Sequence, residues 1–83
     1  MVMNMNPIKN YLNKAPFKII IEEKKLYIAN YKRLISLEDN YISLVTSNKK
    51  IIIKGIKLSL KKIEEEELLV EGTIQDVEVL DEI

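Results

Sequence analysis

Hydrophobic and polar residues alternate along most of this chain, and turn residues interrupt the alternation at short intervals. One phrase occurs three times: two hydrophobic positions separated by one residue, followed two residues later by Asn30, Gly55 or Gly72. Alternation with a period of two is typical of a strand with one buried face. Gly, and to a lesser extent Asn, reaches positive φ at low steric cost. We therefore expect Asn30, Gly55 and Gly72 to be structural turns that end short strands.

The same alternation predicts an all-β domain of seven or eight short strands. They cover residues 17–21, 25–29, 34–37, 41–46, 51–54, 57–61, 68–71 and 73–80. Strands that recur about every 8–12 residues are typical of sandwiches and barrels. A compact meander or sandwich and an irregular, solenoid-like stack of rungs both fit this spacing. In the last strand the face assignment slips, which predicts a β-bulge near Asp76.

A helix competes with strands only over residues 58–69. The lysines and glutamates of this segment are good helix formers. Because Gly55 and Gly72 bracket the segment closely, we expect two strands joined by an acidic turn instead.

A short amphipathic helix is predicted before the first strand. Pro7 suits its first position, and Pro16 ends it. Its apolar face consists of Ile8, Tyr11 and Leu12. A helix this short is not stable alone in water, so this face must pack on its own domain, on a partner or on a membrane surface. The chain thus divides into a tail and helix over residues 1–15 and a β domain over residues 16–83.

Composition restricts the chemistry of this single domain. The 83 residues include no His, no Cys and no Trp, and only two are Gly. The usual general base, the thiol nucleophile and most transition-metal ligands are therefore missing. Two isolated glycines also cannot form a phosphate-binding loop. We expect no enzyme activity, no catalytic residue, no cofactor and no metal.

Charge and hydropathy narrow the partners. Thirteen basic residues balance thirteen acidic ones, whereas a nucleic-acid binder is usually basic over its contact face. A small RNA-binding barrel would need the lysines gathered on one face. Zero net charge also leaves little repulsion between copies. No apolar run reaches the roughly 18 residues of a membrane span, and the N-terminal pattern is not that of a secretory signal. The sequence predicts a cytoplasmic protein.

Aromatic and basic positions beside the predicted strands are candidate interface residues. Tyrosine combines an apolar ring with a polar end, and lysine discourages unwanted pairing at strand edges. The candidates are Tyr31, Arg33, Lys50 and Lys57, together with Ile8, Tyr11 and Leu12 of the predicted helix.

The order of these segments resembles the YabP/YqfC family of sporulation proteins, and the YqfC branch in particular. The resemblance covers about residues 16–80. It rests on Leu26-Tyr27-Ile28, Asn30-Tyr31-Lys32, Leu34-Ile35, Ile42, Leu44, Thr46-Ser47, Ile51, Ile53, Gly55, Leu58, the run from Glu66 to Gly72, and Ile74. Each piece is common by itself, but the ordered set is fairly specific. This chain departs from the family at Arg33 and Lys49, where the family often has Gly.

The resemblance implies a small all-β protein without catalytic residues that acts in assembly of the spore envelope, coat or cortex. It implies a place in the mother cell at the surface of the engulfed forespore. We expect the partners to be further copies of the chain or other spore-envelope proteins, bound along strand edges, with no small-molecule substrate and no nucleic acid. The alternative is a peripheral adaptor whose N-terminal helix binds a membrane surface or a morphogenetic partner.

Overall fold

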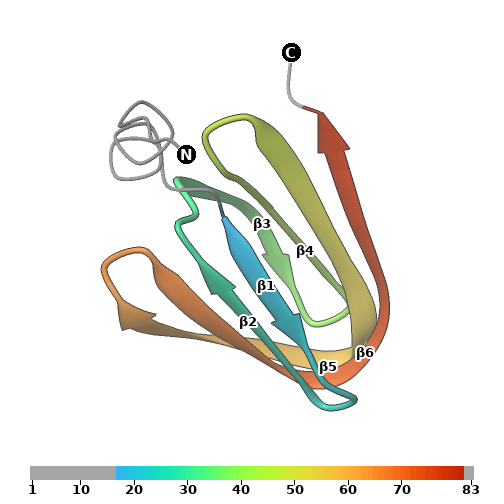
Figure 1. Ribbon diagram of the computed structural model, residues 1–83. Helices are drawn as coiled ribbons and strands as arrows, with labels where there is room; N and C mark the ends of the chain where they lie inside the picture. The colour runs from blue at the N-terminus through green and yellow to red at the C-terminus, as the bar shows by residue number, and fades with distance from the viewer. Residues whose placement is uncertain (1–16, 82–83) are drawn as a thin grey trace, which may run out of the picture.

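The computed structural model of the chain describes residues 17–81. These residues form an all-β fold, six antiparallel strands in one open sheet with the order β1-β2-β6-β5-β4-β3 (Figure 1). The strands are β1 (Lys18–Ile21), β2 (Lys25–Ala29), β3 (Arg33–Glu38), β4 (Tyr41–Val45), β5 (Lys49–Glu64) and β6 (Glu67–Asp81). No helix lies within residues 17–81. The predicted helix, with Ile8, Tyr11 and Leu12, lies outside the described residues.

The strand count is six rather than seven or eight because two strands are long. β5 has 16 residues and includes both predicted strands 51–54 and 57–61. β6 has 15 residues and includes both 68–71 and 73–80. Gly55 and Gly72 therefore lie inside strands, not at their ends. The predicted acidic turn is confirmed, since Glu65 and Glu66 connect β5 to β6.

The long β5–β6 hairpin bends near its middle and curves around the four shorter strands (Figure 1). Its register shifts between Lys54 and Gly55 and again between Ile56 and Ser59. β-bulges of this kind bend a strand and increase its local twist. The first shift inserts Gln75 as an extra residue of β6, so the bulge predicted near Asp76 is confirmed.

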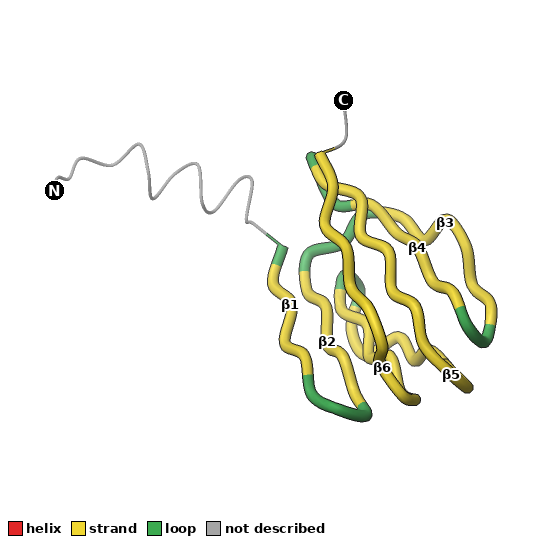
Figure 2. Tube along the Cα trace, turned by 90° about the vertical axis from the view of Figure 1, so that its right-hand side faces the viewer, coloured by secondary structure: helices red, strands yellow, loops and turns green. Residues whose placement is uncertain are grey.

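The bend divides the sheet into two layers. The first layer joins β1 and β2 to residues 67–71 of β6 and residues 59–64 of β5. The second layer joins β3 and β4 to residues 50–54 of β5 and residues 76–80 of β6. In the side view β1 and β3 lie at opposite ends of the sheet (Figure 2).

The core consists of the side chains that the two layers turn toward each other. Its members are Leu26 and Ile28 of β2, Ile42 and Leu44 of β4, Ile51, Ile53 and Leu58 of β5, and Leu68 and Val70 of β6. Both layers contribute alternate positions, as the period of two predicts. Full burial of one such aliphatic side chain contributes about 1.5–3 kcal/mol, so the contact between layers is the main source of stability in this small domain.

The turns of both short hairpins hold the bend in place. Four backbone hydrogen bonds connect them to β5 and β6: Gly55 N–H to Asn40 O at 3.3 Å, Leu58 N–H to Asp39 O at 2.7 Å, Gly72 N–H to Lys24 O at 3.0 Å, and Ile74 N–H to Glu23 O at 3.3 Å. The β3–β4 turn thus fixes the bend of β5, and the β1–β2 turn fixes the bend of β6.

Candidate interaction surface

Residues 17–81 contain neither a group of metal-binding side chains nor a buried polar side chain that lacks a hydrogen-bond partner. Among them no three His, Cys, Asp or Glu side chains are grouped as metal ligands would be. Every buried side-chain nitrogen or oxygen in this part of the chain has a hydrogen-bond partner. We find no helix in it that is long and apolar enough to cross a membrane. The features that stand out on this surface are the edges of the sheet.

Each layer has two edges, which gives four edges in all. The first layer ends at β1 on one side and at residues 59–64 of β5 on the other. The second layer ends at β3 and at residues 76–81 of β6. Along any such edge the backbone N–H and C=O groups of alternate residues face outward and can pair with a further strand.

Exposed apolar side chains concentrate on these four edges. Eight large hydrophobic residues are at least 44% exposed, and seven of them lie on an edge. They are Ile20 and Ile21 of β1, Ile35 and Leu37 of β3, Ile63 of β5, and Val79 and Leu80 of β6; the eighth, Ile56, lies at the bend. Exposed apolar surface beside unpaired backbone is what an added strand would cover.

The four edges differ in regularity. β1 pairs with β2 through all of its residues without a register shift. β3 contains a bulge between Leu34 and Ser36, and the β5 edge contains one between Lys62 and Glu64. Bulges twist an edge and hinder further pairing. The β6 edge is regular but acidic, with Asp76, Glu78 and Asp81. β1 is therefore the edge that is regular and carries a single charged residue, Lys18.

Lysines of β5 form ion pairs with acids of β6. Lys54 Nζ lies 3.7 Å from Glu78 Oε2, and Lys61 Nζ lies 3.7 Å from Glu71 Oε1. Exposed pairs of this kind contribute about 0–1 kcal/mol each. These pairs connect β5 to β6 within one chain, so the charges of these two lysines are already partnered by acidic residues.

Lys49 and Asp81 form a further pair where β5 begins and β6 ends. Lys49 Nζ donates a hydrogen bond to Asp81 Oδ1. This hydrogen bond, and secondly the positive charge of Lys49, lower the pKa of the Asp81 carboxyl. A lowered carboxyl pKa means that the folded chain stabilises the charged form.

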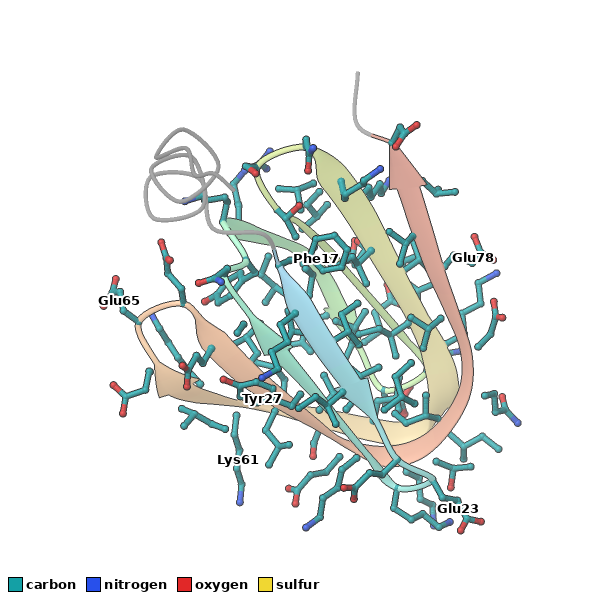
Figure 3. All side chains as sticks on the ribbon, in the orientation of Figure 1. Phe17, Glu23, Tyr27, Lys61, Glu65 and Glu78 are labelled. Carbon is teal, nitrogen blue, oxygen red and sulfur yellow. The ribbon has the colours of Figure 1, made fainter. Side chains whose placement is uncertain are left out.

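The outer face of the first layer carries one apolar row. Ile20, Tyr27 and Leu69 are paired across β1, β2 and β6, and Lys61 of β5 ends the row. Figure 3 shows Tyr27 and Lys61 on this layer. Burial against these neighbours raises the pKa of the Tyr27 hydroxyl, and its hydrogen bond to Glu67 raises it further. Tyr27 thus lies opposite the exposed Ile20 on this face.

The predicted interface residues of the described chain lie apart from one another. Tyr31 is partly buried and packs against the core. Arg33 begins the edge strand β3 and is exposed. Lys50 lies in the middle of the second layer, between Val45 of β4 and Leu80 of β6. Lys57 is exposed at the bend, where its φ is 55°. Of these four residues only Arg33 lies on an edge.

The predicted turn residues have different local roles. Asn30 follows β2 with φ 69°, and its N–H donates to Glu66 O at 2.7 Å. Gly72 has φ 132° inside β6. Gly55 lies so close to the neighbouring strand that an added Cβ would be 2.1 Å from Thr73 O. The two glycines therefore permit the bend of the long hairpin.

The exposed isoleucines of β1 were absent from the predicted interface residues. A signal for them exists in the sequence, because Ile19, Ile20 and Ile21 break the alternation with three hydrophobic residues in succession. In a domain with one buried face, such a run must expose at least one large apolar side chain.

Comparison with known families gives a match over nearly the whole chain. The sequence model of the YabP family matches residues 14–82, which include every strand of the sheet. Comparison with curated proteins and with solved structures gives no match.

Proposed function

The chain belongs to the YabP family, and from this premise we propose that it is a non-enzymatic sporulation protein that acts in assembly of the spore envelope, coat or cortex. Family membership indicates a sporulation-related role. We propose in addition that the protein works by self-association or by binding other envelope proteins along its strand edges. Its place of action in this proposal is the mother cell, at the surface of the forespore.

The observation that carries the proposal is the location of exposed apolar side chains. Seven of the eight lie on the four edges of the sheet. An added strand gains main-chain hydrogen bonds from the edge and covers the side chains next to it. The same surface would be a liability for a protein that works alone, since natural proteins usually protect edge strands.

The composition of the chain favours a function based on binding rather than on catalysis. The sequence has no His and no Cys, so the commonest acid–base and nucleophilic side chains are missing. Its net charge of zero allows copies to approach closely. Small domains also gain stability from association, because their own core is limited.

The proposal is tested by the solution mass of the purified chain. Light scattering after size exclusion is recorded across a wide concentration range at low salt. We expect the mass to rise from monomer to dimer or larger species with concentration. A constant monomer mass up to high micromolar concentration would contradict self-association.

A chain that lacks residues 1–15 separates the proposal from the adaptor alternative. An edge-based assembly keeps its concentration-dependent mass after this deletion, because every edge lies in residues 17–81. An adaptor that works through its N-terminal segment keeps its fold but loses its localisation in sporulating cells.

A further inference from the structure

The backbone of β1 offers two outward-facing residues. Glu22 N–H donates to Lys25 O at 2.8 Å and closes the β1–β2 hairpin. In an antiparallel pair, hydrogen-bonded and non-hydrogen-bonded residue pairs alternate. From the β1–β2 register it follows that the backbone groups of Ile20 face β2, whereas those of Ile19 and Ile21 face away. Within residues 17–81 no strand pairs with that side of β1.

The side chains of β1 provide apolar surface on both faces of this edge. Ile21 is 54% exposed, and Ile20 is 45% exposed. Ile20 lies on the outer face opposite Tyr27, while Ile21 shares the core side with Leu26. A strand added to β1 would therefore cover one isoleucine on each face of the sheet.

The charged residues at the two ends of β1 are complementary under antiparallel self-pairing. Lys18 begins the strand and Glu22 follows it, both exposed. When Ile19 of one copy faces Ile21 of the other, the outward backbone groups of both strands meet. In this register Ile20 faces its own symmetry mate, and Lys18 faces Glu22 at both ends.

Other registers lose this match. Only outward-facing residues can exchange hydrogen bonds, so the neighbouring registers are shifted by two residues. One of them sets Lys18 opposite Ile20, and the other sets Glu22 opposite Ile20. Opposite charges directly across a strand pair stabilise it, and each shifted register forfeits both of these pairs.

The remaining edges are poor candidates for the same contact. Two copies of the β6 edge would bring Asp76, Glu78 and Asp81 of both chains close together, and the β5 edge is interrupted by its bulge between Lys62 and Glu64. Like charges directly opposite each other are destabilising. The β3 edge is interrupted by its bulge between Leu34 and Ser36.

We propose that β1 joins two copies of this chain, antiparallel about a twofold axis at Ile20, with Lys18 of each copy opposite Glu22 of the other. The sheets of both copies then run continuously through the contact, and the contact surface is the same on each copy. This inference rests on the proposed function and assigns the surface and register of its self-association.

Charge exchange tests the register in the full-length chain. Lys18→Glu sets two glutamates opposite each other at both ends of the contact, and Glu22→Lys sets two lysines there. We expect each variant to weaken the dimer about tenfold at low ionic strength, as measured by sedimentation equilibrium. The double variant Lys18→Glu/Glu22→Lys restores opposite charges and is expected to regain wild-type affinity.

An equimolar mixture of the two single variants is the sharpest form of this test. In a mixed dimer, a glutamate of one variant faces a lysine of the other at both ends of the contact, so the mixture should associate more tightly than either variant alone. In parallel, Ile20→Lys places two lysines at the centre of the contact and should abolish the dimer. Glu65→Lys, in the exposed β5–β6 turn labelled in Figure 3, carries the same charge change as Glu22→Lys and should leave the dimer unchanged.

The outcomes separate this inference from the proposed function. If the wild type associates and every β1 variant associates with the same affinity, β1 is not the contact surface. Self-association itself would then still stand. Weakening by the single variants without recovery in the double variant or the mixture would overturn the register. Equal weakening by Glu65→Lys would show a nonspecific charge effect and overturn the assignment. A wild type that stays monomeric throughout overturns this inference and the self-association in the proposed function, whereas binding to other envelope proteins is unaffected.

Discussion

Gly72 lies against the backbone of Lys57 at the bend of the β5–β6 hairpin. A Cβ on Gly72 would be 2.6 Å from the carbonyl oxygen of Lys57. Both residues have left-handed backbones, with φ 132° at Gly72 and φ 55° at Lys57. One strand thus bends through a glycine, whereas the facing strand bends through a lysine that bears conformational strain.

Substitution of Gly72 by Ala should destabilise the fold strongly. The new Cβ would collide with backbone, which cannot move aside as a side chain can, and Ala disfavours a φ of 132°. We expect a loss of about 3 kcal/mol or more in the free energy of unfolding. Urea unfolding of Gly72→Ala measures this loss. The control is Ser59→Ala, at an exposed position of β5. A change below about 0.5 kcal/mol would contradict the packing of the bend.

Lys57→Gly should stabilise the protein. A left-handed backbone costs a non-glycine residue about 1–2 kcal/mol, and glycine removes that cost while increasing the entropy of the unfolded chain. We expect a net gain of up to about 1 kcal/mol in urea unfolding. Lys61→Gly, in the extended part of the same strand, is the matched control and should lose stability. Equal losses at both positions would show that Lys57 is not strained.

The strands between residues 17 and 46 could be predicted closely from the sequence. Each is short, and each ends at a polar turn whose residues are adjacent in the chain. β2 was predicted with its observed bounds, Lys25–Ala29. For β5 and β6 the local sequence was not sufficient to predict the strand length. A glycine can end a strand, and it can equally permit a bend inside a longer strand. The distinction depends on distant residues, such as Asn40 and Lys24, whose carbonyl groups bind Gly55 and Gly72.

The interaction surface was harder to predict than the strands. Exposure on an edge depends on the order of strands in the sheet, which is a non-local property. Lysine is typical of strand edges, yet Lys50 is flanked by β4 on one side and β6 on the other. Isoleucine is typical of protein cores, yet Ile20 lies on β1, which is an outermost strand of the sheet. Alternation reports which residues share a face, but it does not report which strand is outermost.

The buried and exposed ends of one cross-strand row should respond differently to truncation. Leu37, Ile42 and Ile53 are paired across β3, β4 and β5. Ile53 is 0% exposed and Leu37 is 53% exposed. We expect Ile53→Ala to cost about 2–5 kcal/mol in urea unfolding, and Leu37→Ala to cost less than about 1 kcal/mol. Comparable losses would mean that Leu37 is covered in solution, which would indicate a contact along β3.

Acidification should remove the contribution of the Lys49–Asp81 pair. A carboxyl whose pKa is lowered on folding stabilises the folded state above its ordinary pKa, here 3.8, and loses this effect as the pH falls through the lowered value. Wild type should therefore melt at a higher temperature than Asp81→Asn at neutral pH. The difference should shrink as the pH falls below about 4.

The same substitution at Asp76 is the control for this pH dependence. Asp76 lies on the same strand as Asp81 and forms no ion pair with a lysine or arginine among residues 17–81. We expect the melting temperature of Asp76→Asn to follow that of the wild type more closely than Asp81→Asn does. A difference between wild type and Asp81→Asn that persists to pH 2 would show that the Asp81 side chain acts through hydrogen bonds of its neutral form and not through its charge. The Lys49–Asp81 pair would then not be what fixes the start of β5 to the end of β6.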